Sequence, residues 1–323
     1  MTLHLYDKDI NDLILEKKYP LPASEQRNVM ECTTSIDHNI GNAYYKEIYF
    51  MGVHIGYGNL ALNNKTIVSF ESDFETVEMH FALKGSNSTY FTNFSEEISF
   101  KPFQHNIMYA NSLKGKMVWD CKGFEVFEVN LSPSFFKKYL PEDTSIFNSF
   151  RKIMDSGCSS MMKSQNHQIS NEMYAIIRDI IQCNRDGIYK RMFLEAKVIE
   201  LLLLQLEQLK DPISQTKLKK QDVEKMYAIR DHITQNMAEP CLLIDLAHQF
   251  GTNEFTLKRG FKELFGTTVF SFWNDIKMQE AKKLLLRGDL NVSEVSNMMG
   301  FKNSRHFSTS FKKHFGQSPS QIC

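Results

Sequence analysis

β-Branched and aromatic residues dominate the chain between about residues 44 and 131, in short runs of apolar and polar positions. Turn-forming pairs such as Asn63-Asn64 and Lys122-Gly123 separate these runs. The runs cover residues 48–55, 66–70, 77–83, 88–94, 105–110, 116–121 and 124–131. Short strands at this regular spacing are typical of a β-sandwich or a small barrel.

Helical spacing of apolar residues, in steps of three and four, takes over after residue 131. The expected helices cover the segment after Ser132-Pro133 and residues 147–154, 169–183 and 188–210. Residues 10–15, in the ambiguous segment before the strands, also predict a short helix that ends before Pro20. The pattern therefore predicts strands first and helices second.

The helix predicted over residues 188–210 has more apolar positions than one core-facing stripe needs. Its stripe consists of Ile188, Met192, Ala196, Ile199, Leu203 and Leu206, and Leu201, Leu202 and Leu204 widen it. Two interpretations stay open, because the excess apolar surface requires some partner. The helix is either fully buried in the core, or it forms a dimer seam. The candidate dimer residues are Ile188, Met192, Ile199, Leu203 and Leu206.

The last eighty residues contain a near-repeat of a helix, a sharp turn and a second helix. The matching positions are Gly251, Leu257 and Phe261 in the first copy and Gly300, Phe307 and Phe311 in the second. The glycines are 49 residues apart and the phenylalanines Phe261 and Phe311 are 50 apart. A glycine after a helix suits the left-handed conformation, and Asn253 is a suitable N-cap for the helix that follows. Two such copies, joined by a helix over residues 267–286, predict two helix-turn-helix motifs.

Charge is unevenly distributed, although the whole chain is formally neutral with 38 basic and 38 acidic residues. From residue 212 to the end there are 16 Lys and Arg against 11 Asp and Glu, a net charge of +5, which leaves −5 on the rest. A basic C-terminal module predicts an anionic partner. A solvated surface is the alternative, and the charge alone does not decide between them.

Cysteine spacing and hydropathy indicate where in the cell the protein is expected. The six cysteines show no spacing typical of a metal site or a disulfide framework, so reduced thiols in the cytosol are expected. The N-terminus has no apolar signal segment, and the longest apolar run, residues 198–204, is too short to cross a bilayer. We therefore expect a cytoplasmic protein without a membrane partner.

Signature positions across about residues 242–322 resemble those of the AraC family of bacterial transcription regulators. They include Leu246-Ala247, Gly260-Phe261-Lys262, Ala281, Leu284-Leu285, Met299-Gly300-Phe301, His306-Phe307, residues 311–316 and Ser318-Pro319-Ser320. The stretch 257–270 resembles more particularly the PchR-like subgroup, which is associated with ferric siderophore uptake. The chain departs from the family at Lys277, where arginine is usual, and after Ser320, where an aromatic residue and an arginine usually follow.

The resemblance implies an α+β protein. Residues 1–160 would form a cupin-like, ligand-sensing β-barrel, and residues 161–210 a helical dimerisation segment. A linker over residues 211–220 would lead to a DNA-binding domain over residues 221–323, all helical and with two helix-turn-helix motifs. The implied function is a homodimeric, sequence-specific activator that contacts RNA polymerase and is controlled by a small-molecule effector, with a ferric siderophore as one candidate. A regulator controlled by a protein partner is the main alternative, and a metal-dependent cupin enzyme with a DNA-binding tail is the other.

The resemblance also assigns the DNA-contacting positions. The base-reading positions fall on Phe255, Lys258 and Arg259 in the first copy and on Ser304, Arg305, His306, Ser308 and Thr309 in the second. Phosphate contacts are expected from Lys262, Lys302, Lys312 and Lys313. Arginine can bind guanine with two hydrogen bonds, whereas lysines on phosphates position the domain without reading sequence. The alternative for each lysine is a solvated helix face, and His306 could simply pack between helices.

The strand region carries no enzyme signature. Cupin enzymes bind metal through a His-x-His pair with a downstream Glu and a further His, whereas His80 stands alone in Glu78-Met79-His80, and His54 and His105 lack partners at that spacing. There is also no nucleophile elbow, P-loop or dinucleotide fingerprint. We therefore expect no catalytic residues, no metal site and no cofactor. The many aromatic residues of the strands could instead line a pocket for a planar ligand.

Overall fold

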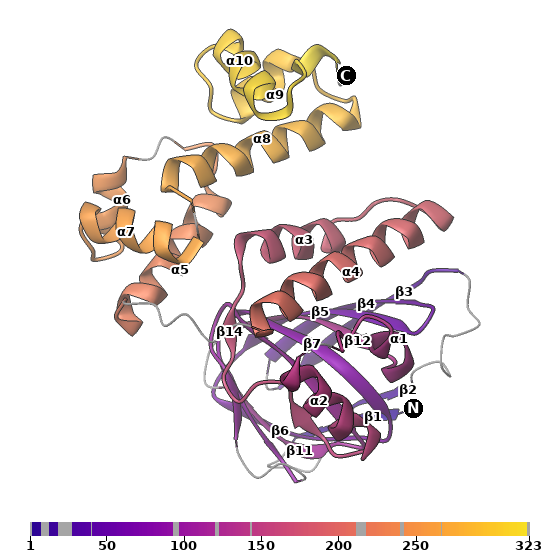
Figure 1. Ribbon diagram of the computed structural model, residues 1–323. Helices are drawn as coiled ribbons and strands as arrows, with labels where there is room; N and C mark the ends of the chain where they lie inside the picture. Colours follow the sequence, from indigo (N-terminus) through magenta and orange to yellow (C-terminus); the bar gives the residue numbers. More distant parts are fainter. Residues whose placement is uncertain are drawn as a thin grey trace. The chain divides into compact units, whose positions relative to one another are not determined.

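The computed structural model (Figure 1) describes residues 2–7, 13–18, 28–39, 41–92, 97–119, 123–142, 144–210, 218–239, 242–265 and 267–321. The chain divides into two compact units, Met1–Ser214 and Gln215–Cys323. Within the described residues, strands and four helices make up the first unit, and the second unit is helical. The protein is therefore a mixed α and β protein with a helical C-terminal part.

Two antiparallel sheets form most of the first unit. The six-stranded sheet has the order β2 (Leu13–Lys18), β1 (Thr2–Asp7), β6 (Thr66–Ser72), β11 (Lys114–Trp119), β8 (Asn87–Phe91) and β9 (Ile98–Phe100). The eight-stranded sheet has the order β13 (Ser160–Met161), β10 (Gln104–Asn111), β7 (Glu75–Lys84), β12 (Gly123–Leu131), β5 (Val53–Leu62), β4 (Gly41–Phe50) and β3 (Met30–His38), and β14 (His167–Gln168) also pairs with β10. Within the described residues neither strand order closes into a ring.

Two of the local expectations were wrong. The run over residues 48–55 is not one strand, because Met51-Gly52 forms a hairpin turn between β4 and β5. The helix expected over residues 10–15 is also absent from its described part, because Leu13 begins β2, which pairs with β1. Pairing with a neighbouring strand satisfies the backbone hydrogen bonds there and overrides the local spacing. Residues 8–12 lie outside the described residues.

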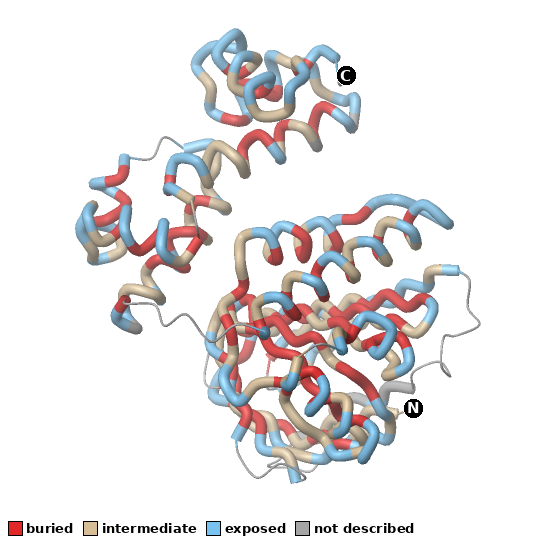
Figure 2. Tube along the Cα trace, in the orientation of Figure 1, coloured by how far each residue is buried: buried red, intermediate tan, exposed pale blue. Residues whose placement is uncertain are grey.

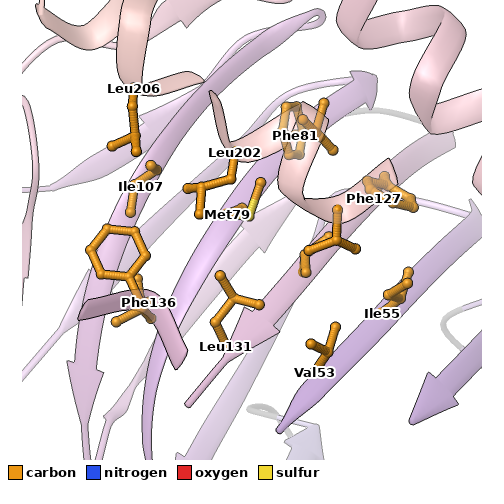
Figure 3. Close-up of a cluster of buried hydrophobic side chains, with 14 of the residues drawn as sticks. Val53, Ile55, Met79, Phe81, Ile107, Phe127, Leu131, Phe136, Leu202 and Leu206 are labelled. Carbon is orange, nitrogen blue, oxygen red and sulfur yellow. The ribbon is translucent and has the colours of Figure 1, made fainter. Parts of the chain in front are cut away.

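Four helices of the first unit pack on one face of the eight-stranded sheet. They are α1 (Pro133–Lys137), α2 (Ser145–Asp155), α3 (Asn171–Ile181) and α4 (Gly187–Lys210). Successive side chains of a strand point to opposite faces, and in β7 Val77, Met79 and Phe81 belong to the core beneath these helices. Leu202 and Leu206 of α4 reach this core, beside the side chains of the sheet (Figure 3). Burial is accordingly concentrated in the strands under α3 and α4 (Figure 2).

Helix α4 has a core face and a separate apolar stripe. The core interpretation holds for the first face, and the dimer interpretation stays a prediction for the stripe. The buried face carries Leu194, Val198, Leu201, Leu202, Leu206 and Leu209. The other face exposes Ile188, Met192 and Leu203, each with at least half of its surface, and Ile199 is partly buried. Leu206 was wrongly placed in the stripe, because it is only 5% exposed and packs in the core.

The second unit consists of six α-helices and a 3₁₀ turn within the described residues. They are α5 (Lys220–Gln235), α6 (Leu243–Gln249), α7 (Glu254–Phe265), α8 (Val269–Arg287), α9 (Val292–Met298), α10 (Ser304–Phe315) and η1 (Pro319–Gln321). The two copies of the repeat are thus the helix pairs α6–α7 and α9–α10, with α8 between them (Figure 1). A search of the described helices found none with the length and apolar character needed to cross a membrane.

Candidate nucleic-acid interface and ligand cavity

The first helix pair turns sharply at Gly251. This glycine has a φ of +62°, and its N–H donates to the carbonyl of His248 at 3.0 Å. Helix α7 then begins after Asn253, whose side-chain oxygen accepts a hydrogen bond from the Thr256 N–H at 2.8 Å. This bond confirms the N-cap expected from the sequence. Leu257 and Phe261 are fully buried, which fixes the face of α7 that remains exposed.

The second helix pair repeats this arrangement. Gly300 has a φ of +72°, and its N–H donates to the Asn297 carbonyl at 2.9 Å. Asn303 caps α10 by accepting a hydrogen bond from the Arg305 N–H at 2.8 Å. Phe307 and Phe311 are fully buried beneath α10. The two pairs therefore place α7 and α10 on their neighbours in the same way, with the opposite face of each helix exposed.

The exposed face of α7 carries the three candidate base-reading residues of the first copy. Phe255 is 72% exposed, and the guanidinium carbon of Arg259 lies 5.7 Å from its ring centroid. Lys258 is paired with Glu254 one turn earlier, at 2.5 Å between Nζ and Oε1. All three side chains can reach a ligand, but each already has an interaction within the helix.

The candidates of the second copy lie at the start of α10 and along its first turns. Ser304, Arg305, His306 and Thr309 are exposed, and Ser308 is partly buried. His306 is thus not a packing residue between helices. The Thr309 hydroxyl donates to the Arg305 carbonyl at 2.9 Å. Within the described residues the Arg305 side chain has no ion-pair partner, so it is available to an anion or a base.

The candidate phosphate-binding lysines are all on the surface. Lys262, Lys302, Lys312 and Lys313 are exposed. Lys277 differs, because it is only 6% exposed and its Nζ lies 3.8 Å from the centroid of the Trp273 ring. Burial lowers the pKa of Lys277. The position at which the family usually has arginine is therefore a packing position in this protein.

A cavity of about 310 Å³ lies between the two sheets of the first unit. Most of its wall is apolar, and it includes aromatic residues expected from the strand pattern. Tyr44, Tyr45, Phe70, Phe91 and Trp119 line the cavity. Phe50 and Phe81 from the same pattern instead lie in the core beneath the helices. The size and the apolar wall suit a small organic ligand.

Two polar side chains of the six-stranded sheet line this cavity without a hydrogen-bond partner among the described residues. They are Asn87, through Oδ1, and Trp119, through Nε1. The two residues lie opposite each other on β8 and β11, and both are less than 8% exposed. Buried polar groups normally have a partner. A ligand that donates to Asn87 and accepts from Trp119 would supply one.

The eight-stranded sheet contributes an acidic group to the same cavity. Glu78 and His80 on β7 and Glu128 on β12 line it, and one ligand-type atom from each lies within 4.8 Å of the others. The expectation that His80 stands alone was therefore wrong. The sequence does not reveal the group, because Glu128 is distant along the chain and reaches His80 only through the strand pairing of β7 with β12.

Family comparisons agree with this architecture. A helix-turn-helix domain family matches residues 246–322, and the family described as the regulatory protein PchR N-terminal domain matches residues 64–220. The regulatory protein PchR of Pseudomonas aeruginosa is 32% identical over 123 residues, which are 37% of this chain and 42% of that protein. The transcriptional activator RhaS of Pectobacterium atrosepticum is 32% identical over 124 residues, which are 38% of this chain and 44% of that protein.

Among solved structures, an apo ToxT variant from Vibrio cholerae aligns over 84% of this chain and 96% of its own, at 14% identity and a TM-score of 0.36. The chain spans less than half the length of these two curated relatives. Its helix-turn-helix match and its PchR-type N-terminal match define the class that it resembles, which is the AraC family of transcription regulators. Within that family it is similar to PchR.

Proposed function

We propose that the protein is a sequence-specific DNA-binding transcription regulator that acts in the cytoplasm. The observation that carries this proposal is the pair of similarly packed helices, α7 and α10, each with an exposed arginine on the face opposite its buried residues. An α-helix fits the major groove of B-DNA, and residues near its exposed start reach the base edges. The relatives named above are transcription regulators rather than enzymes, which agrees with this function.

Each helix has a distinct set of candidate contacts. Arg259 and Arg305 would each bind guanine O6 and N7 with two hydrogen bonds. The remaining base-reading candidates are Phe255, Lys258, Ser304, His306, Ser308 and Thr309. The phosphate-binding candidates are Lys262, Lys302, Lys312 and Lys313. If α8 holds the two helix pairs about one DNA turn apart, roughly 34 Å, one subunit would read two successive major grooves.

The first unit would be the sensor of a small-molecule effector, and its two sheets would correspond to a cupin-like fold. The cavity and its unpartnered Asn87 and Trp119 support this assignment. An effector that binds one conformation better than another shifts the protein between active and inactive states. The active state would be an activator that contacts RNA polymerase, and a ferric siderophore is one candidate effector. A protein partner that controls the regulator without a small molecule is the alternative, but the cavity favours a ligand.

The exposed stripe of α4 would form a homodimer contact. Ile188, Met192 and Leu203 are each at least half exposed, and Tyr189 beside them is 75% exposed. Such an apolar stripe on a surface helix is typical of an interaction site. The contact would use Ile188, Met192, Ile199 and Leu203, without the buried Leu206.

DNA binding is tested with the full-length protein and a random-sequence duplex at several salt concentrations. About six phosphate contacts per subunit predict a slope near −5 for log affinity against log salt, at about 0.9 per contact. Lys114→Ala, which changes an exposed lysine of the first unit, should leave the slope unchanged. A folded protein with no DNA affinity at low salt would contradict the proposed function.

Dimerisation is tested by sedimentation of Leu203→Glu. A charge buried in an apolar contact without a partner costs several kcal/mol, so this variant should sediment as a folded monomer. Glu207→Lys, a charge change on the same helix, is the control. A wild-type protein that is monomeric at high concentration would remove the dimer from the proposal and leave DNA binding untouched.

A further inference from the structure

Three side chains with metal-binding atoms share one wall of the cavity. Glu78 and His80 are two residues apart on β7 and therefore point to the same face of the sheet. Glu128 lies opposite His80 in the pairing of β7 with β12. All three line the cavity, on the face opposite the helix-covered core. The fold thus brings two carboxylates and one imidazole together inside the ligand cavity.

The His80 imidazole is buried and faces Glu78. Its Nδ1 lies 2.7 Å from Oε1 of Glu78, and His80 is only 8% exposed. Nε2 has no hydrogen-bond partner within the described residues, so no group there fixes which nitrogen carries the proton. With the proton on Nε2, the lone pair of Nδ1 points toward Glu78. A metal ion in place of the proton between them would then bind Nδ1 and the Glu78 carboxylate together.

Carboxylates outnumber lysines and arginines among the described residues of this part of the cavity wall. Besides Glu78 and Glu128, the fully buried Glu47 lines the wall, with His54 Nε2 at 3.3 Å from its Oε1. Among the described lining residues there is no lysine or arginine. Buried carboxylates of this kind are stabilised by a cation that binds beside them.

We propose that Glu78, His80 and Glu128 bind a divalent transition-metal ion, of the class of Mn²⁺, Fe²⁺, Co²⁺ or Zn²⁺. An imidazole with two carboxylates suits these ions better than Ca²⁺ or Mg²⁺, for which oxygen ligands alone are usual. Bonds of about 2.1 Å allow two ligands of one ion to be up to roughly 4.2 Å apart. Because the three ligand atoms already lie within 4.8 Å, small side-chain rotations bring them to one ion.

Tyr45 holds Glu128 in place for this role. Its hydroxyl donates a hydrogen bond to Oε1 of Glu128 from β4, across the intervening strand β5. The contact requires a glycine at position 56, because a Cβ there would lie 2.2 Å from the Tyr45 hydroxyl oxygen and 2.9 Å from Cγ of Glu128. Tyr45 is therefore a positioning residue for the metal ligand Glu128.

The inference rests on the proposed function only in that it places the metal in the proposed effector cavity. Three protein ligands leave coordination positions of the ion open. An organic effector with oxygen or nitrogen donors would complete them, while its apolar part fills the cavity and a polar group reaches Asn87 and Trp119. The metal ion would thus make the cavity selective for chelating ligands.

Isothermal titration calorimetry of the chelator-treated full-length protein with Mn²⁺, and separately with Zn²⁺, tests the site. We expect one ion per chain, and at least about tenfold weaker binding in Glu128→Gln and in His80→Asn. Glu125→Gln is the matched control, because Glu125 lies on the same strand outside the cavity and binds Tyr57 instead. Unchanged binding in Glu128→Gln, or no binding of either ion below about 1 mM, would overturn the proposal.

Thermal unfolding shows whether the variants remain folded. Glu128→Gln removes a partly buried charge beside Glu78, so without metal it should be at least as stable as the wild type. Added Mn²⁺ should raise the unfolding temperature of the wild type and of Glu125→Gln, but not that of Glu128→Gln. An equal rise in all three proteins would mean that the ion binds elsewhere. DNA binding and its salt dependence are measured separately, without metal. A protein that binds DNA but no metal would contradict only this inference, and a protein that binds metal but no DNA would contradict only the proposed function.

Discussion

The two helix pairs of the second unit have the same pattern of buried apolar residues, but they differ in the contacts that hold their turns and their exposed residues. In the first pair, Lys225 of α5 donates from Nζ to the carbonyl of Gly251 at 2.5 Å, so a flexible side chain holds the turn. In the second pair, the backbone of Ala238 lies directly against Gly300. The second turn is therefore fixed by close backbone contact, and the first by a contact that can adjust.

The start of each pair shows a similar difference. Helix α9 begins with a capping box, in which Asn291 accepts from the Glu294 N–H at 3.0 Å and Glu294 accepts from the Asn291 N–H at 2.7 Å. Helix α6 begins after Leu242 without a side-chain cap. On α7 and α10 the contrast is reversed, because Lys258 and Arg259 have partners within α7 whereas Arg305 has no ion-pair partner in the described part of the chain. The second helix pair is therefore held more rigidly than the first, although its arginine, Arg305, is less restrained than Arg259.

The largest expected effect comes from the two turn glycines. Gly300→Ala should cost roughly 2–5 kcal/mol of unfolding free energy, because φ is +72° and the new Cβ would lie 2.1 Å from the Ala238 carbonyl oxygen. Gly251→Ala should cost only about 1–2 kcal/mol, because the nearest atom is Nζ of Lys225 at 3.9 Å.

Denaturant unfolding followed by tryptophan fluorescence measures this difference. In a Trp119→Phe background Trp273 is the remaining tryptophan, since the chain has two. Its Nε1 donates to the Met237 carbonyl at 2.9 Å, next to the contact that is being tested. Equal losses in the two glycine variants would remove the distinction between the two turns.

A smaller effect is expected at the cap of α9. Asn291→Ala removes the acceptor of both the Ser293 and the Glu294 N–H groups and should cost about 1 kcal/mol, measured in the same way. Asn291→Asp keeps the acceptor and should remain close to the wild type. If the alanine variant is as stable as the aspartate variant, the capping box contributes nothing to the second pair.

The smallest effects are expected from the lysines that follow the buried Phe261 and Phe311. Lys262→Ala and Lys312→Ala should each weaken binding to all DNA sequences about equally and lower the salt slope by roughly one. Fluorescence anisotropy at several salt concentrations measures the slope. A loss of discrimination between sequences in either variant would show that the lysine reads bases and does not merely contact phosphate.

The second unit could be predicted closely from the sequence because its signals are local. Gly251, Asn253 and Leu257 lie within seven positions of one another, and a turn, a cap and a buried stripe follow from them directly. The exposed faces of α7 and α10 then follow from the helical period. The helix expected over residues 10–15 failed because β2 is stabilised by its pairing with β1, and a local pattern contains no information about that partner.

Local sequence patterns could not predict which residues meet in the ligand cavity, for the same reason. Glu78 and His80 are visible as neighbours in the sequence, but Glu128 joins them only through the register of β12 on β7. Asn87 and Trp119 likewise meet through the pairing of β8 with β11. On α4, apolar residues surround so much of the helix that the period did not separate Leu206, which is in the core, from Leu203, which is exposed.

The most direct test of the central claim, that α7 and α10 read separate grooves, is a competition assay with Arg259→Ala and Arg305→Ala. The wild-type protein first selects a preferred site from a random-sequence library, and a panel of single-base variants of that site is then measured for all three proteins. Each substitution should cost about 1–3 kcal/mol on the preferred site and relax discrimination at one base pair. The two base pairs should lie about one helical turn apart. Altered preference at the same base pair, or a change only in overall affinity for Arg305→Ala, would contradict the claim.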